Sequence, residues 1–197
     1  MSGDLEKMAT CIYDNFVPLL WCNEGEGKGF LSMKPLASWI IDCNDRIKFL
    51  TDWFDSGTPD VFWISGLFFP QAFFTGSQQN FARKHTIAVD QISFSFIIKS
   101  HMSYKDVREK PEAGVYTYGV YLEGCKWDYE QEELHDSDPK KLFVEMPMIH
   151  FMPVQNRVNP ETGFYHCPLY KVLSRNGTLS TTGHSTNFVL DIELPSD

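Results

Sequence analysis

Histidine and cysteine side chains near the C-terminal end of this 197-residue chain are the groups that could act as a nucleophile or bind a metal. His166 directly precedes Cys167, and His150 lies sixteen residues upstream. However, the sequence contains no C-x-x-C or H-x-x-x-H spacing, and Pro168 follows at once in a segment with strand character. We interpret these side chains as structural, and a Cys–His enzyme using Cys167 or Cys125 stays open as an alternative.

Paired carboxylates are the second chemistry to consider, because Glu132 and Glu133 are adjacent. They belong to an acidic segment, residues 128–138, that contains no Lys or Arg and carries −6 of the net charge of −9. Its carboxylates are Asp128, Glu130, Glu132, Glu133, Asp136 and Asp138. No apolar neighbours would raise a carboxyl pKa there for acid catalysis, so the sequence predicts a solvated acidic loop.

Phosphate-binding motifs are absent from the sequence. The segment Gly25-Glu-Gly-Lys-Gly29 lacks the spacing and the hydroxyl of a phosphate-binding loop, and no G-x-G-x-x-G follows a strand. No basic patch would follow a phosphate backbone, so nucleic acid is not expected as a partner. We assign no catalytic, cofactor-binding or metal-binding residue, and we expect no cofactor in this chain.

Two further stretches leave alternatives open. Tyr116, Tyr118, Tyr121 and Trp127 could line a small-ligand cavity inside a curved sheet, although such alternation is more typical of a core. Residues 178–187 place six hydroxyl side chains around Gly183 and His184. These hydroxyls could satisfy the backbone of a turn, or they could form a docking loop.

Helical periodicity dominates the first part of the sequence. Leu5, Met8, Ile12, Phe16 and Leu19 predict a helix capped near Ser2 and disturbed at Pro18. A second helix with Pro35 in its first turn is expected to pack as a core helix along Leu36, Ile40, Cys43, Ile47, Leu50 and Phe54. A short strand near 61–65 and a helix from Pro70 to His85 follow, in an aromatic segment that we expect to be buried.

The period then changes to alternation, which predicts strands. Residues 92–98, 116–122 and 188–194 alternate clearly, and residues 142–146, 148–152 and 164–172 predict shorter strands. Pro147, Pro153 and Pro168 are expected at edges, bends or strand ends. We therefore predict an α+β fold, with residues 1–88 helical and residues 89–197 forming an antiparallel, incompletely closed β-barrel of about six strands.

Composition indicates a soluble globular protein of a reducing compartment. Five cysteines are an odd number, and no signal peptide precedes them, which favours thiols over a disulfide framework. No apolar run reaches the length of a membrane span, so we expect no membrane association.

Several motifs resemble, in order and spacing, the C-terminal domain of dynein heavy chains. The first group is Trp63-Ile-Ser-Gly66, Phe68-Phe-Pro-Gln-Ala-Phe-Phe-Thr-Gly76 and Gln79-Asn-Phe-Ala-Arg-Lys84. The second is Tyr118-Gly-Val-Tyr-Leu-Glu-Gly-Cys-Lys-Trp-Asp128. The third is Cys167-Pro-Leu-Tyr170, Thr178-Leu-Ser-Thr-Thr-Gly-His-Ser-Thr-Asn-Phe-Val189 and Leu194-Pro-Ser-Asp197. The hydroxyl-rich ending resembles the axonemal branch, and inner-arm members in particular.

The resemblance implies a fragment of a minus-end-directed, ATP-driven microtubule motor of cilia and flagella. In that family the C-terminal domain follows a ring of AAA+ modules and lies on one face of it. The resemblance thus implies a non-catalytic, regulatory domain whose partners are the ring modules and, through the parent motor, intermediate chains, light chains and microtubules. ATP and Mg²⁺ would belong to the parent, and the implied location is the cytoplasm and cytoskeleton of the axoneme. A free-standing β-barrel that binds a small ligand is the alternative.

Overall fold

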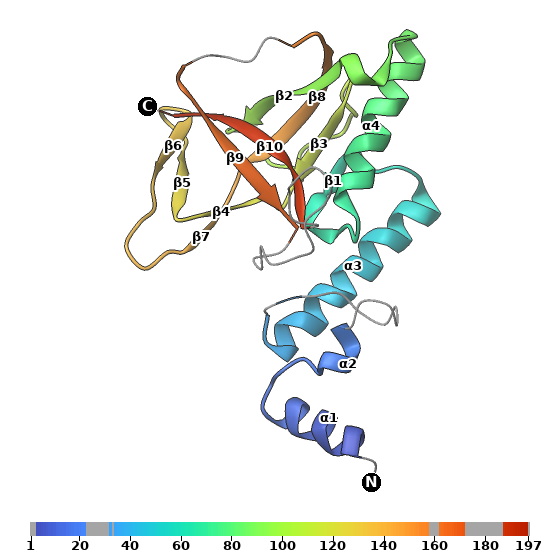
Figure 1. Cartoon of the computed structure of the whole chain (residues 1–197), viewed down its shortest axis with the longest axis vertical. Helices are drawn as coiled ribbons and strands as arrows, with labels where there is room; N and C mark the ends of the chain where they lie inside the picture. Colours follow the sequence, from blue (N-terminus) through green and yellow to red (C-terminus); the bar gives the residue numbers. More distant parts are fainter. Residues whose placement is uncertain (1–2, 23–31, 33, 158–161, 172–186, 197) are drawn as a thin grey trace. The chain divides into compact units, whose positions relative to one another are not determined.

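The computed structural model describes residues 3–22, 32, 34–157, 162–171 and 187–196 (Figure 1). The protein divides into two compact units. Residues 1–55 and 172–187 form one, which we call the helical unit, and residues 56–171 and 188–197 form the other, which we call the sheet unit.

The helical unit contains α1 (Gly3–Tyr13), α2 (Leu19–Cys22) and α3 (Leu36–Ser56), whose last residue lies past the unit boundary. The single helix predicted to reach Leu19 is wrong, because α1 ends at Tyr13. Asn15 has a left-handed backbone with φ of 60°, and Pro18 offers no backbone N–H and disfavours a helical residue before it. The predicted cap at Ser2 lies outside the described residues.

Asn15 follows the end of one helix and also caps the start of another. Its backbone carbonyl accepts a hydrogen bond from the Leu36 N–H at 2.9 Å, and its side-chain Oδ1 accepts one from the Ala37 N–H at 3.1 Å. These are two of the N–H groups that the start of α3 cannot satisfy within the helix. Pro35 directly precedes α3, and its carbonyl accepts the Trp39 N–H at 2.8 Å. These hydrogen bonds therefore join Asn15, which precedes the undescribed residues 23–31, to the start of α3, which follows them.

The sheet unit begins with β1 (Val61–Trp63), the 3₁₀ turn η1 (Ile64–Gly66), α4 (Pro70–His85) and the 3₁₀ turn η2 (Val89–Gln91). The strands that follow are β2 (Ile92–Lys99), β3 (Val115–Tyr118), β4 (Tyr121–Glu123), β5 (Cys125–Asp128) and β6 (Glu133–Asp136). The last strands are β7 (Phe143–Glu145), β8 (Met148–Gln155), β9 (Phe164–Tyr170) and β10 (Phe188–Pro195). Helix and strand together give the mixed content that the sequence predicts.

The predicted β-barrel is not supported. The described strands form one four-stranded sheet in the order β1-β3-β8-β2 and three two-stranded sheets, β10-β9, β4-β7 and β5-β6, none of which closes (Figure 1). Strand β1 also runs parallel to β3, whereas the other pairs are antiparallel as expected.

Gly119 explains much of the difference between the predicted barrel and the observed sheets. The alternating run 116–122 is expected to be one strand, but it is divided between β3 and β4, which belong to different sheets. Gly119 lies at the break with φ of +82°, a conformation that residues with a side chain rarely adopt. A Cβ there would also meet the Trp63 ring at 2.6 Å and the Ser65 hydroxyl at 2.8 Å, so the backbone turns where only glycine fits.

The predicted acidic loop is partly a hairpin of β5 and β6. Cys125 pairs with Asp136 and Asp128 with Glu133, so acidic residues occupy a regular antiparallel ladder. The Asp128 carboxylate accepts hydrogen bonds from the N–H groups of Glu130 and Gln131, both at 2.8 Å, which closes the turn. These backbone bonds lower the pKa of Asp128. Charge alone does not reveal that the turn residues supply their own hydrogen bonds.

Helix α4 spans the residues predicted for it, with Pro70 at its start, and its aromatic residues form a core against the four-stranded sheet. The Phe74 ring lies 4.5 Å from the Phe151 ring and 5.7 Å from the Phe94 ring, measured between centroids. The expectation that the whole aromatic segment is buried is wrong at Phe68 and Phe69, which are both exposed.

The prolines lie where they do not interrupt the ladders of the four-stranded sheet. Pro147 falls between β7 and β8. Pro153 pairs with Phe94 on one side, and the β3 ladder on the other side ends at Phe151. Pro168 lies in β9, whose described partner is β10 alone. The prediction of edge and end positions for these prolines is therefore confirmed.

Candidate functional site

The Cys–His pair is not arranged for nucleophilic catalysis. His166 and Cys167 are consecutive in β9, so their side chains point to opposite faces of the strand. Cys167 packs against the apolar core, whereas the exposed His166 ring places Nδ1 3.9 Å from Glu193 Oε1. The imidazole therefore does not face the thiol that it would have to deprotonate.

The other candidate thiol and imidazole also behave as structural groups. Burial raises the pKa of the Cys125 thiol, which disfavours the reactive thiolate. Burial lowers the pKa of His150 and outweighs the opposing effect of its hydrogen bond from Nε2 to the Ala113 carbonyl, at 2.8 Å. Among the described residues, no three His, Cys, Asp or Glu side chains lie together as a metal site would require.

The four aromatic residues expected to line a ligand cavity do not share one. Trp127 is buried and donates from Nε1 to the Ser100 hydroxyl at 3.0 Å, and Tyr116 packs on the His150 ring. Tyr121 is exposed. The space between the sheets around Val120, Leu122 and Leu194 is about 30 Å³, room for roughly one water molecule rather than a ligand.

Several of the acidic residues have side-chain neighbours on the surface. Glu133 Oε1 lies 3.2 Å from His135 Nε2, and Glu132 Oε1 lies 3.9 Å from His101 Nε2. Hydrogen bonds from Lys126 and Lys141 lower the pKa of Asp138. Residues 178–186 of the hydroxyl-rich stretch lie outside the described residues, so neither interpretation of that stretch is tested.

An apolar line along α3 is the feature that helical periodicity assigned wrongly. Ile40, Ile47 and Phe54 recur every seven residues, and their side chains are 42%, 58% and 89% exposed. The sequence predicts that they pack in the core. Instead α3 buries Leu36, at the start of this line, and Trp39 beside it, and the line becomes more exposed toward Phe54.

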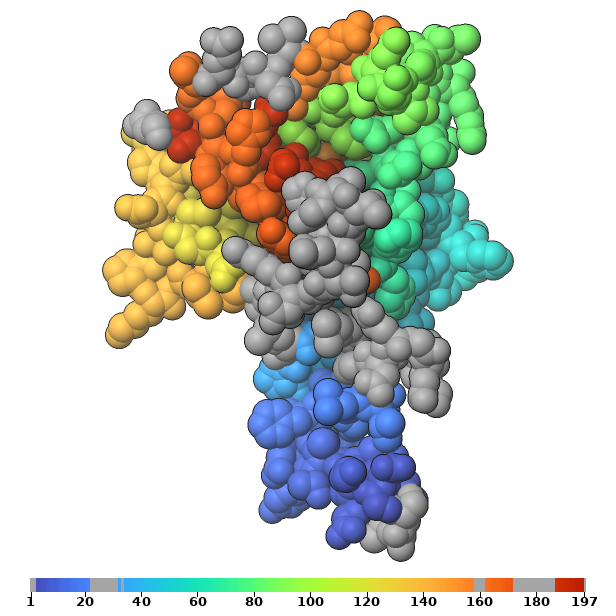
Figure 2. All heavy atoms as spheres, viewed as in Figure 1, coloured from blue at the N-terminus to red at the C-terminus, as the bar shows by residue number. Residues whose placement is uncertain are grey.

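Helix α1 and the residues after it continue this pattern within the same unit. Leu5 and Ile12, again seven residues apart, are exposed, as are Phe16 and Leu19. Figure 2 shows the dark blue atoms of α1 open to view on this face. Isolated exposed apolar residues are ordinary, but a concentration on short helices indicates a surface that binds another polypeptide. We call these side chains, together with Ile40, Ile41, Ile47 and Phe54, the apolar helical surface.

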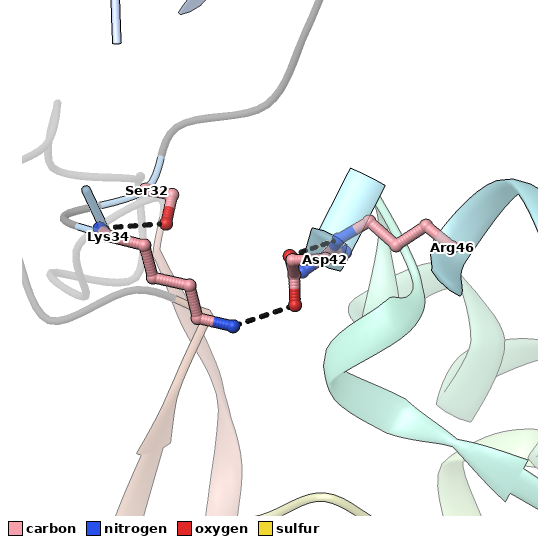
Figure 3. A network of polar contacts seen from close by, with 4 residues as sticks. All are labelled: Ser32, Lys34, Asp42 and Arg46. Atoms are coloured by element: carbon pink, nitrogen blue, oxygen red, sulfur yellow. Dashed lines mark hydrogen bonds and ion pairs between the residues drawn. The ribbon is translucent and has the colours of Figure 1, made fainter. Parts of the chain in front are cut away.

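An ion-pair network around the buried Asp42 fixes the start of α3 (Figure 3). Asp42 is buried, and its two carboxylate oxygens accept hydrogen bonds from Lys34 Nζ at 2.7 Å and from Arg46 Nε at 2.9 Å. The Ser32 hydroxyl accepts the Lys34 N–H at 3.2 Å. Burial by itself raises the pKa of Asp42, but the two cations outweigh it and hold that pKa below its ordinary value. The network ties the segment before α3 to the helix.

None of the helices in the described ranges combines the length and the apolar character needed to cross a bilayer.

The described residues combine helices with several small open sheets. The family model for the C-terminal domain of dynein heavy chains matches residues 1–197, and the protein belongs to this family.

Individual relatives agree over the whole sequence. It is 51% identical over 197 residues to dynein axonemal heavy chain 1 of Rattus norvegicus and 48% identical over 196 residues to the protein of that name from Homo sapiens. It is 42% identical over 197 residues to dynein axonemal heavy chain 3 of Homo sapiens. Each match covers 100% of this sequence, which spans 4% to 5% of the length of these relatives.

Proposed function

We propose that this protein is the non-catalytic C-terminal domain of an axonemal dynein heavy chain, which packs on the AAA+ ring of the motor and tunes its output. The observation that carries the proposal is the apolar helical surface. Its most exposed member, Phe54, is 89% exposed in the isolated domain and would be covered in a larger assembly. The names of the relatives support the axonemal assignment and a location in cilia and flagella.

The proposed mechanism depends on contacts between this domain and the ring that differ from one ring conformation to another. A rigid domain that packs across several ring modules stabilises the ring conformations in which its contacts are best satisfied, and its effect cannot exceed the difference in contact energy between them. The Asp42 network and the Asn15 cap make the start of α3 rigid enough to transmit such a bias.

ATP and Mg²⁺ would act in the parent motor and not in this domain. The sequence supports this proposal, because it contains no phosphate-binding loop of the G-x-x-x-x-G-K-[ST] type. Intermediate chains, light chains and microtubules would be partners of the whole motor, reached through its other domains.

The proposal is tested in the full-length motor by placing carboxylates on the apolar helical surface. Ile47→Glu combined with Phe54→Glu adds two charges to one side of α3, where the ring would bind, so we expect altered ATPase activity and altered microtubule gliding velocity. Lys48→Glu makes the same change of two charge units at an exposed polar position on another side of α3 and should leave both unchanged. Wild-type ATPase and gliding in the first variant would refute the packing role.

A further inference from the structure

A hollow of about 400 Å³ lies in the sheet unit, apart from the apolar helical surface. It is bounded by the end of β2 and the turn after it, the end of β3, the turn of the β5–β6 hairpin, and the junction of β7 with β8. Its lining residues are Ser100, His101, Met102, Ser103, Tyr104, Tyr118, Tyr129, Glu145, Met146, Pro147 and Met148. Because Met102, Tyr129 and Glu145 are exposed, the hollow opens to solvent.

A pair of stacked tyrosines forms one wall of this hollow. The rings of Tyr104 and Tyr118 lie 3.8 Å apart between centroids, with planes inclined by 3°. Lys105 Nζ lies 5.7 Å from the centroid of the Tyr104 ring, so this aromatic wall already has one of the protein's own cations near it. Aromatic faces attract cations because the ring quadrupole is negative on its faces.

The polar groups of the hollow favour a cation as ligand. Glu145 is its one carboxylate among the described residues, and no lysine or arginine of that set lines it. The Ser100 hydroxyl is already bound by Trp127 Nε1, and the Ser103 hydroxyl accepts the Lys105 N–H at 3.3 Å. Among the described residues that line the hollow, Glu145 thus supplies a negative charge that no lysine or arginine balances, which favours a cation over an anion.

The surroundings of the hollow add negative charge. Tyr129 belongs to the turn of the acidic hairpin, and Glu132 of that turn approaches His101 on the rim at 3.9 Å. The hairpin forms one edge of the sheet unit, where its atoms are yellow in Figure 2. The acidic segment thus continues into the rim of an aromatic hollow.

We propose that this hollow binds an arginine side chain carried by a polypeptide segment with apolar residues beside it. The guanidinium is planar, stacks on aromatic rings and pairs with a carboxylate through two parallel hydrogen bonds, so it matches the tyrosine wall and Glu145 together. The adaptable methionine side chains Met102, Met146 and Met148 suit the apolar neighbours of that arginine. This binding site does not depend on the proposed role of the helical surface.

The test uses the whole 197-residue protein with ¹³C-labelled methionine methyl groups and the probe peptide acetyl-Gly-Leu-Arg-Leu-Gly-amide, observed by NMR. We expect the methyl signals of Met102, Met146 and Met148 to shift on titration, while those of Met8 and Met152, which do not line the hollow, stay in place. Replacing the arginine by the uncharged isostere citrulline should weaken binding by roughly fifteen- to fiftyfold, since the cation over the aromatic ring contributes about 1 kcal/mol and the ion pair with Glu145 is lost as well.

Two matched variants test whether the carboxylate charge of the hollow itself contributes to peptide binding. Glu145→Gln alters an exposed side chain and should weaken binding by a factor of roughly three to ten, because an ion pair with arginine is lost. Asp90→Asn removes the same charge at the far end of β2 and should leave binding unchanged. The proposal is overturned if the three methyl signals do not shift, if the citrulline peptide binds equally well, or if Glu145→Gln binds like wild type.

Discussion

The guanidinium of Arg157 pairs with the carboxylate of Glu193 and joins the end of one sheet to the last strand of another. Arg157 follows β8, donates from Nη1 to the Phe94 carbonyl of β2 at 2.5 Å, and lies over the Phe96 ring at 5.2 Å. Glu193 belongs to β10 and is buried. This ion pair thus adds to the apolar core contacts that join the β10–β9 sheet to the four-stranded sheet.

Glu193→Gln is expected to destabilise the protein by about 3 kcal/mol, because it leaves the largely buried Arg157 guanidinium without its counter-charge. Urea denaturation followed by fluorescence measures the difference. Glu112→Gln removes a charge from an exposed loop residue and should change stability by less than about 0.5 kcal/mol. If the two variants unfold at the same urea concentration, the ion pair does not join the sheets in solution.

Asp42→Asn should lower the stability of α3 by about 2 kcal/mol near neutral pH, since the hydrogen bonds from Lys34 and Arg46 lose their charged acceptor. The folded pKa lies below the ordinary value of 3.8, so the folded state binds fewer protons than the unfolded state. The stability that ionised Asp42 contributes to the folded state is therefore fully present above pH 3.8 and is lost as the pH falls through the lower pKa of the folded state.

The difference in α3 stability between Asp42→Asn and wild type should therefore disappear at acidic pH. Hydrogen exchange of the α3 amides at several pH values measures this gap. Asp45→Asn, at an exposed position of the same helix, provides the control and should show no such dependence. A gap that persists unchanged well below pH 3.8 would contradict the ionic origin.

Gly114→Ala and Gly124→Ala separate backbone conformation from steric overlap. Both glycines have a left-handed backbone, with φ of +77° and +73°. A Cβ at Gly124 meets nothing within 4 Å, so the substitution should cost about 1 kcal/mol.

A Cβ at Gly114 would overlap the Phe151 carbonyl oxygen and lie 2.8 Å from Pro153 Cδ. We expect Gly114→Ala to cost about 2 kcal/mol more than Gly124→Ala, as insertion into a packed site does. Thermal unfolding of the two variants checks the difference. Equal unfolding temperatures would mean that β8 moves away from Gly114 at little cost.

Local patterns predict the elements, and long-range contacts decide how they assemble. Alternation places β2 and β10 correctly, and Pro70 marks the start of α4. The barrel prediction fails because closure depends on which strands pair. Gly119 is decisive there through its closeness to Trp63, a contact between residues far apart in sequence.

The exposed line on α3 is not predictable from periodicity, because an apolar stripe looks the same whether its partner lies in the same polypeptide or outside it. Ile40, Ile47 and Phe54 satisfy the helical spacing of a core helix. The family motifs offer the missing signal, since they imply a piece of a larger assembly whose helices would be covered elsewhere.

Ile41→Ser combined with Phe54→Ser tests whether the apolar helical surface is open in this protein. Both side chains are more than half exposed, so we expect the unfolding free energy to change by less than about 1 kcal/mol in total. Self-association, measured by analytical ultracentrifugation, and binding of the dye ANS should both fall, because the patch shrinks. Leu36→Ala, at a buried position of the same helix, should instead cost about 2–4 kcal/mol. A loss of stability of that size in the serine double variant would show that the protein itself covers this surface, which would remove its availability for a ring.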